Sequence, residues 1–360
     1  MKKICFFIGS MNLTGGTERV TSVIANELLL QKFQVNILSV QCGDNPFFNI
    51  SDGVIVDQLY DVAGRGVTRL PKTIFNLRRY LVSHKIDILI VVDSILSIYT
   101  LPAVCGLNIR HICWEHFNYN VSLGKRSRVL ARKLAAKYSD DIVTLTDRDK
   151  KLWMNNNRMH ARLTTVPNPI TIEPPISTSF SRDKIILAVG RLTYQKGFDL
   201  LLQAWSLFSK KFPDWRLRII GDGEDKSMLE KLRKELFIES SSEILPKTKN
   251  IASHYQQASF FVMSSRFEGL PLVLIEAQAY GLPAISFDCD TGPSEIIENN
   301  KSGWLCDADN VAALADGLSD AICFSQNPIN YKLYSTAAVM NTERFQLSNV
   351  VSDWVALLSK

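Results

Sequence analysis

The chain has 360 residues, of which 46% are hydrophobic and 21% are charged, and its formal net charge at pH 7 is +5. These values are typical of an ordinary globular protein, for which this length predicts two domains. The seven cysteines are scattered and form no Cys-x-x-Cys pair, so they argue against a zinc site or a disulfide framework and favour a reduced, cytosolic protein.

Two segments resemble membrane-directed sequence. The chain starts with the basic "MKK", but the apolar run that follows ends at Gly9 and is too short for the core of a signal peptide. Residues 86–107 are the most membrane-like part, but Asp87, Asp93 and Pro102 interrupt them, which favours a buried strand followed by a helix. We therefore expect a soluble cytoplasmic protein that is at most peripheral to the inner face of a cell membrane.

The first half of the chain predicts a parallel α/β domain. An apolar strand over residues 2–9 leads into a glycine turn, an amphipathic helix over 18–32 and a strand over 34–40, which together make a βαβ unit. Further short runs rich in Ile and Val favour strands that are buried on both faces, and they lie at 87–93, 110–116 and 141–146.

A second α/β series follows a break at 164–183 that is rich in Pro, Ser and Thr. It predicts strands at 184–190, 215–223, 259–265 and 283–287, and helices at 197–212, 225–236 and 271–280. We expect two doubly wound, Rossmann-like sheets that face a cleft, because ligands bind beyond the carboxyl ends of parallel strands. The expected parts are an N-terminal domain, a linker, a C-terminal domain and a helix that returns to the first domain, at 1–170, 171–183, 184–340 and 341–360.

Two basic stretches lie in the first half of the chain. Residues 124–137 hold six Lys and Arg residues and no acid, and a second stretch contains Arg65, Arg69, Lys72, Arg78, Arg79 and Lys85. They are either solvated helix faces or a surface that is attracted to anionic lipid, where each such cation contributes about 1 kcal/mol.

The segment "RFEGLPLVLIEAQAYGLPAISF", residues 266–287, carries two acids around one short helix. Pro271 is expected at the first helical position and Gly281 in the left-handed conformation past the end. Glu268 then lies in the loop before the helix and Glu276 in its second turn, where carboxylates beside free amides are suited to sugar hydroxyls. The alternative is that Glu268 caps the helix and Glu276 is a solvated helix residue.

Two further segments offer groups for a diphosphate. Arg191 and Lys196 lie between a strand and a helix, where Arg can bind phosphate oxygens bidentately and Lys acts as a point charge. "DTGPSEII", residues 290–297, places Gly292 after a strand and opens a helix whose amides could bind phosphate. Surface cations and a plain helix start are the alternatives.

The Gly15-Gly16 turn, Gly-Arg-Leu-x-x-x-Lys-Gly from residue 190, Glu-x7-Glu from 268 and Gly-Pro-x-Glu-Ile-Ile from 292 together resemble glycosyltransferase family 4. The resemblance covers nearly the whole chain and is most specific over 184–306. It implies the GT-B fold and a retaining transferase without a resident cofactor. The sequence at residues 114–117 and 291–297 most resembles that of bacterial enzymes that build lipopolysaccharide or O-antigen from UDP-sugars.

The resemblance also implies roles for individual residues. Glu276 would hold the ribose of the nucleotide sugar, and Glu268 with the amides of Gly269 and Leu270 would contact the donor hexose. Arg191 and Lys196 would neutralise the diphosphate, near Gly292. Gly16, with Gly15, would let the first-domain backbone approach the diphosphate or the acceptor, and His116 would lie near the donor sugar.

The expected partners are a nucleotide-sugar donor and a lipid-linked saccharide acceptor, with no nucleic acid. No metal is expected, although Asp288 and Asp290 superficially match an Asp-x-Asp metal motif. Pro246 stands where the family usually has a turn glycine near the nucleotide base, which leaves the base preference open. A nucleotide-sugar 2-epimerase of the same fold and a non-catalytic binding subunit are the alternative functions.

Overall fold

The computed structural model describes residues 1–64, 69–174 and 182–360. The chain divides into a first unit, Met1–Thr171 with Leu347–Lys360, and a second unit, Ile172–Gln346. Arg65 of the second basic stretch and residues 175–181 of the expected linker lie outside the described residues.

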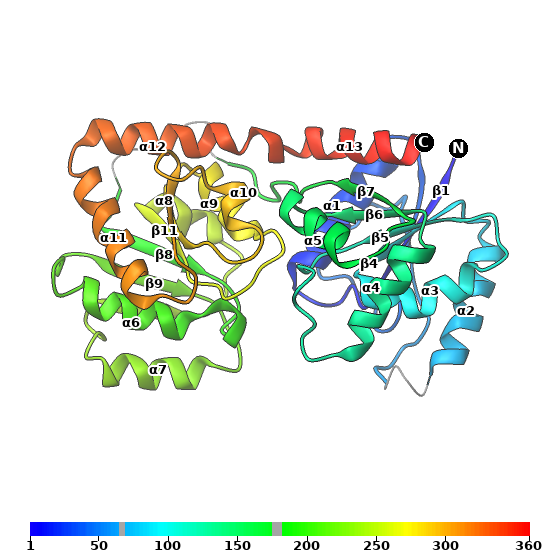
Figure 1. The fold of residues 1–360 in the computed structure, drawn as a ribbon, viewed down its shortest axis with the longest axis horizontal. Helices are drawn as coiled ribbons and strands as arrows, with labels where there is room; N and C mark the ends of the chain where they lie inside the picture. The colour runs from blue at the N-terminus through cyan, green and yellow to red at the C-terminus, as the bar shows by residue number, and fades with distance from the viewer. Residues whose placement is uncertain (65–68, 175–181) are drawn as a thin grey trace. The chain divides into compact units, whose positions relative to one another are not determined.

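The first unit is built on one parallel sheet (Figure 1). Within the described residues, seven strands lie in the order β3-β2-β1-β4-β5-β6-β7. Their bounds are β1 Lys3–Ile8, β2 Gln34–Ser39, β3 Ile55–Gln58, β4 Ile88–Val92, β5 Arg110–Trp114, β6 Asp141–Thr144 and β7 Arg162–Thr165.

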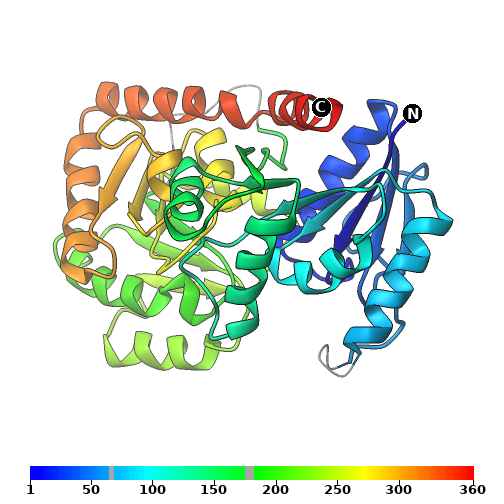
Figure 2. The same cartoon turned by 45° about the vertical axis from the view of Figure 1, so that its right-hand side comes forward.

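Helices cover both faces of this sheet, as the views in Figures 1 and 2 show. In register, Phe7 pairs with Val91 and Val91 with Cys113, so these three side chains share a face. Phe7 and Val91 pack with Leu77 and Ala103 of two helices on that face, and Cys113 packs with Ala135 of a third. The helices on this face are α2 Leu70–Ser83, α3 Ser97–Val104, α4 Arg126–Tyr138 and α5 Asp147–Asn156.

The opposite face carries α1, Gly16–Leu30, and α13, Leu347–Ser359, which contact each other. Trp114 lies on this face, and its ring centroid is 4.8 Å from that of Trp354 in α13. Both indoles are fully buried, so this contact joins the end of the chain to the first unit.

The second unit contains a second parallel sheet, and its strands in the described residues have the order β10-β9-β8-β11-β12-β13. They are β8 Ile185–Val189, β9 Arg216–Ile220, β10 Ser242–Leu245, β11 Phe260–Met263, β12 Ala284–Phe287 and β13 Gly303–Cys306. The helices are α6 Phe198–Phe208, α7 Lys226–Glu235, α8 Ile251–Gln257, α9 Leu272–Ala279, α10 Pro293–Ile296, α11 Val311–Ser325 and α12 Pro328–Asn341.

The two faces of the second sheet are also both covered. Phe260 and Val262 pack in one core cluster with side chains of α6, α7 and α11. Phe261 points the other way, toward Tyr255 of α8 at 6.2 Å between ring centroids. The predicted architecture of two doubly wound sheets is confirmed.

Some local expectations differ from the structure. Glu343–Phe345 forms a 3-10 turn and Gln346 has extended backbone angles, so the last helix begins at Leu347 and does not run through 341–360. Pro271 precedes α9 as its N-cap instead of taking the first helical position. Gly281 does follow the helix with a φ of +71°, as expected.

Candidate functional site

The order of strands in the second sheet reverses between β8 and β11. In doubly wound sheets ligands bind at such a reversal, beyond the carboxyl ends of the strands. Lys196 follows β8 and Glu268 follows β11. The ammonium Nζ of Lys196 lies 2.6 Å from the carboxylate Oε1 of Glu268, with 18% and 7% of the two side chains exposed. A mostly buried ion pair therefore marks the reversal point.

The turn that carries Lys196 is fastened to the loop after β11. Gly197 has a φ of +62°, and a Cβ on it would lie 2.1 Å from the carbonyl oxygen of Ser264. The Ser264 hydroxyl donates to the carbonyl of Lys196 at 2.9 Å, and the amide of Arg266 donates to the carbonyl of Gln195 at 2.8 Å. Only glycine fits position 197, and the close packing of this turn against the loop after β11 fixes the position of Lys196.

Arg191 lies on an exposed loop beside this ion pair. A Cβ on Gly190 would lie 3.3 Å from the Cγ and Cδ atoms of Lys196, so the lysine stem crosses the backbone next to Arg191. Arg191 itself is solvent-exposed, as an ordinary surface cation would be.

Two glycines that the sequence analysis did not single out support the Arg191 loop. A Cβ on Gly221 would lie 1.8 Å from the carbonyl oxygen of Gly190, and one on Gly223 would lie 2.2 Å from that of Leu192. The two backbones can approach this closely only without side chains. The sequence feature that indicates this close approach is the Gly-Asp-Gly triplet after β9, which was predicted as part of the strand over 215–223.

The Thr-Gly-Pro segment packs against the loop of Glu268. The Thr291 hydroxyl donates to the carbonyl of Glu268 at 2.6 Å. Gly292 has a φ of +100°, and a Cβ there would lie 2.7 Å from the ring of Pro271 and 3.0 Å from the carbonyl oxygen of Gly269. The structure thus brings Lys196, Glu268, Gly269 and Gly292 together.

Glu276 is 2% exposed, so the alternative that it is a solvated helix residue is wrong. Its carboxylate accepts a hydrogen bond from the Tyr255 hydroxyl at 3.1 Å, which fixes the side chain between α8 and α9. Pro271, and not Glu268, is the N-cap residue of α9, and the Pro271 side chain makes no capping hydrogen bond. Leu270, just before α9, is buried.

In the first unit, His116 follows β5 and its ring centroid lies 4.4 Å from that of Trp114. Loss of water around the ring lowers the pKa of His116 below its ordinary value, so the imidazole is neutral at pH 7. Its Nε2 is buried, and no described residue lies within hydrogen-bond distance of it.

The loop after His116 is held by a buried arginine of α4. Arg132 donates to the carbonyl oxygens of Asn118, Tyr119 and Val121, and its Nε donates to Glu115 at 3.0 Å. Glu115 also accepts from the Ser94 hydroxyl at 2.5 Å. The loop after β5 is therefore held by Arg132, whose guanidinium is in turn held by Glu115.

The expectation that residues 124–137 form one basic surface is wrong at two positions. Arg132 is 1% exposed, and Arg128 is 3% exposed with both terminal nitrogens on the carboxylate of Asp93, at 2.6 and 2.9 Å. Buried arginines need such partners, because an unpaired buried charge costs several kcal/mol. These two cations stabilise the fold and are not available at the surface.

Gly16 begins α1, and Gly15 is its N-cap with a φ of −82°. The first helical amides lack intrahelical acceptors and lie beyond β1, where the order of the first sheet reverses next to β4. Neither backbone conformation requires glycine, so the conformation alone does not explain why both positions are glycines.

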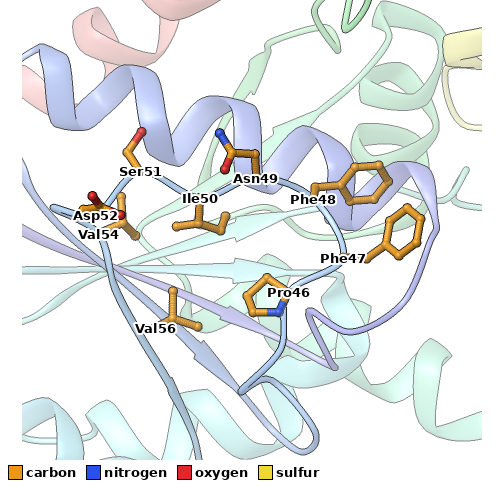
Figure 3. A pocket seen from close by; sticks show the side chains of 9 residues that line it. All are labelled: Pro46, Phe47, Phe48, Asn49, Ile50, Ser51, Asp52, Val54 and Val56. Carbon is orange, nitrogen blue, oxygen red and sulfur yellow. The ribbon is translucent and has the colours of Figure 1, made fainter. Parts of the chain in front are cut away.

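A groove of about 530 Å³ lies in the loop between β2 and β3 (Figure 3). Phe47 and Phe48 stand at one end of the loop in this view, and Ser51 and Asp52 at the other. The Phe47 amide donates to the carbonyl of Met11 at 3.1 Å, so the groove adjoins the glycine turn after β1. None of the predicted site residues lines it.

Two further observations concern metal ligands and membrane-spanning helices in the described residues. Within 1–64, 69–174 and 182–360, no group of three His, Cys, Asp or Glu side chains is arranged to hold a metal ion. None of the helices in these ranges is both long and apolar enough to cross a bilayer.

Comparison with known proteins places the chain in a family. Residues 170–328 match the family model "Glycosyl transferases group 1", and residues 14–174 match "Glycosyltransferase Family 4". An uncharacterised glycosyltransferase of Haemophilus influenzae is 35% identical over 99% of this chain and 100% of its own length. The chain belongs to glycosyltransferase family 4.

Two other relatives of this family 4 glycosyltransferase have more informative names. The amylovoran biosynthesis glycosyltransferase AmsD of Erwinia amylovora is 30% identical, and the match covers the whole of both chains. An α-1,4-N-acetyl-D-galactosaminyltransferase of Campylobacter jejuni, named for a diphosphoundecaprenol-linked saccharide, is 28% identical over 100% of this chain and 99% of its own.

Solved structures share the GT-B fold. TarM has a TM-score of 0.83 at 15% identity and matches 100% of this chain and 99% of its own. HepE of Anabaena, solved with UDP and glucose, has a TM-score of 0.81 at 15% identity, and the match covers both chains completely.

Proposed function

We propose that this family 4 glycosyltransferase moves a hexose or an N-acetylhexosamine from a UDP-sugar to a lipid-linked saccharide in the synthesis of a bacterial surface polysaccharide. The anomeric configuration is retained, and neither a metal ion nor a cofactor is needed. The observation that carries the proposal is the contact of Lys196 with Glu268 at the reversal point of the second sheet, beside Arg191.

The proposed reaction requires fixed positive charge. As the bond between the sugar C1 and the diphosphate breaks, negative charge grows on the diphosphate and the sugar becomes oxocarbenium-like. Lys196 and Arg191 stabilise that charge, and such preorganised electrostatic stabilisation is usually the largest catalytic contribution. The acceptor oxygen forms the new bond to C1 on the same face, and its proton passes to the departing phosphate.

The other site residues have proposed roles that agree with their surroundings. Glu276, fixed by Tyr255, accepts hydrogen bonds from the ribose hydroxyls. Glu268 and the amides of Gly269 and Leu270 contact the donor hexose. His116, whose neutral ring carries a buried Nε2, is the candidate catalytic residue of the first unit.

The relatives support the substrate classes. The names of AmsD and of the Campylobacter enzyme point to polysaccharide synthesis and to a lipid diphosphate carrier. HepE was solved with UDP and glucose, which supports UDP as the donor nucleotide. A lipid-linked acceptor places the enzyme at the cytoplasmic face of the membrane, in contact with anionic lipid.

A donor screen tests this function. The protein is incubated with UDP-, GDP- and ADP-sugars and a membrane extract as acceptor, and nucleotide release and the linkage of the product are measured. We expect release of UDP that depends on the extract, an α-linked product from an α-linked donor, and unchanged activity in EDTA. Conversion of a UDP-sugar to its 2-epimer without any acceptor would instead identify an isomerase.

The role of Glu276 has its own test. We expect Glu276→Ala to weaken UDP-sugar binding at least tenfold in calorimetry, because buried hydrogen bonds to a charged group contribute about 1.5–3 kcal/mol. Glu298→Ala is the matched control, since Glu298 belongs to the same unit and its side chain is 56% exposed. Equal affinities of the two variants would remove the assignment of Glu276.

A further inference from the structure

The helices α2, α3 and α4 lie side by side on one face of the first sheet, where α3 contacts both of its neighbours. Their sequences contain no Asp or Glu. On the opposite face, α1 contains Glu18 and Glu27, and α13 contains Asp353. The cations of this layer come from α2 and α4, because α3 has no charged residue. The helix α5 on the same face adds Asp147 and Asp149 beside Arg148, Lys150 and Lys151.

The burial of Arg128 and Arg132 separates the structural cations of α4 from those at the surface. Arg126, Lys133 and Lys137 are exposed. Lys133 and Lys137 lie seven and eleven residues after Arg126, so the three cations form one stripe along the helix, opposite the two buried arginines. In the described part of the chain, none of the three takes part in an ion pair.

Apolar side chains interrupt this basic stripe. Val129 and Leu130 are 43% and 53% exposed between Arg126 and Lys133. The outer face of α2 repeats the combination, with Phe75 and Val82 at 64% and 55% exposure and the cations Lys72 and Arg79 next to them in the helical stripe. The two helices on either side of α3 thus present the same mixture to solvent.

This mixture suits one kind of partner. Amphipathic helices that lie in the headgroup region combine Lys and Arg with exposed Leu or Phe, which enter the boundary with the acyl chains. A nucleic acid would use the cations but would leave Val129, Leu130 and Phe75 without contacts, since phosphate backbones bind through charge. The charge and the apolar groups together favour an anionic bilayer.

We propose that the outer faces of α2 and α4 dock the protein on an anionic lipid bilayer, with Phe75, Val129 and Leu130 entering the headgroup boundary. The inference deepens the proposed function, because a lipid-linked acceptor resides in such a bilayer. The docking proposal rests on the proposed function only for the reason why the protein would bind a membrane, since docking itself needs neither donor nor acceptor.

Sedimentation with vesicles tests the docking surface. We expect the wild-type protein to sediment with vesicles of phosphatidylglycerol and phosphatidylethanolamine, less so as salt is raised, and to remain in solution with phosphatidylcholine alone. The variant Leu130→Ser/Lys133→Glu should partition at least about tenfold more weakly, because it removes an apolar contact and reverses a charge near the headgroups. A variant on the other helix, Phe75→Ser/Arg79→Glu, should show a similar loss.

The matched control changes the same residue types on the opposite face. Leu30 is 70% exposed at the end of α1 and Lys32 is exposed just beyond it, so Leu30→Ser/Lys32→Glu should bind vesicles like the wild type. Equal loss in the control, or equal binding of wild type and α4 variant, would overturn the proposal, as would equal binding to neutral vesicles. Calorimetry with UDP on the same samples reports on the donor site separately, so a failure of docking and a failure of the proposed function are distinguishable.

Discussion

The carboxyl ends of the two sheets use charged side chains in opposite ways. In the first unit, Arg128 and Arg132 are almost fully buried and pair with Asp93 and Glu115. In the second unit, Lys196 pairs with Glu268 but keeps part of its side chain exposed, and Arg191 is open to solvent. The same location in the same type of sheet therefore holds loops together in one unit and, in the proposed function, binds the diphosphate in the other.

This difference separates stability from activity. A buried ion pair contributes little net free energy, yet removing one partner is costly because it leaves the other charge in a region without water. The pair of Lys196 with Glu268 is less completely buried than the pair of Arg132 with Glu115, so it should cost less to break, and its cation can turn toward a phosphate. Substitutions of Arg128 or Arg132 should thus change mainly the free energy of unfolding, and a substitution of Lys196 mainly turnover.

The largest expected effect is on the stability of the first unit. Arg132→Leu should lower the free energy of unfolding by about 3–5 kcal/mol, because Glu115 loses its closest cation and three carbonyl groups lose their donor. Urea denaturation measures the change. The exposed pair of Lys184 with Asp214 supplies the control, and Lys184→Leu should cost less than about 1 kcal/mol. Similar values for the two variants would contradict the contrast between the units.

The next effect is on turnover in the second unit. Lys196→Ala should lower kcat by about 10²–10³, the usual loss when one electrostatic contact to the transition state is removed. Its melting temperature should fall by less than that of Arg132→Leu, because the Lys196–Glu268 pair is more exposed than the Arg132–Glu115 pair. Lys184→Ala is again the control, because Lys184 precedes β8 at the amino end of the strand whose carboxyl end leads to Lys196. A large loss of stability without loss of turnover would reverse our assignment.

A smaller effect concerns pH. Burial lowers the pKa of His111 to about 4, and its Nε2 lies 2.8 Å from the Thr100 hydroxyl. The unfolded chain gains a proton near pH 6.5 while the folded chain does not, so stability is lost as the pH falls from 6.5 to 4. Between pH 7 and pH 5 this group should account for about 2 kcal/mol.

The variant His111→Gln should remove this part of the acid sensitivity, because glutamine can bond Thr100 but does not titrate. Urea denaturation at pH 7 and pH 5 gives the comparison. His254 of the second unit is only half-buried, so His254→Gln is the control and should change the pH dependence far less. An unchanged pH dependence in His111→Gln would show that His111 is not the titrating group.

The smallest expected effect is on nucleotide affinity. The carboxylate of Glu268 partly neutralises Lys196 and repels a diphosphate. Glu268→Gln keeps an acceptor for the lysine but removes the charge, so UDP should bind about three- to tenfold more tightly in calorimetry, a change of about 1 kcal/mol. Transfer should nevertheless become slower if Glu268 holds the hexose. Glu298→Gln should change neither quantity, and weaker UDP binding in Glu268→Gln would count against a competing carboxylate.

Much of the fold could be predicted because its central strands carry a local signal. Runs such as residues 87–93 are apolar on both faces, which only a covered parallel sheet explains. The four edge strands β3, β7, β10 and β13 were missed, since they have four residues each and all but β13 mix polar with apolar side chains. Their pairing depends on the neighbouring strand and not on their own sequence.

The site could be predicted only as a set of segments. The motifs identified Lys196 and Glu268 as site residues. Their contact joins residues 72 positions apart in the sequence, and no local sequence pattern indicates that two such distant residues touch. The basic stretch shows the opposite problem. Arg128 and Arg132 look like their exposed neighbours in the sequence. Only their contacts with Asp93 and Glu115, which directly follow β4 and β5, show that they are buried.

The buried ion pairs of Arg128 and Arg132 also restrain α4 itself. The helix cannot rotate about its axis without pulling charged groups out of the protein interior, so its solvent side keeps a fixed orientation. A rigid recognition element loses little conformational entropy when it meets its target. A bilayer that contacts Val129 and Leu130 would therefore find them already in position.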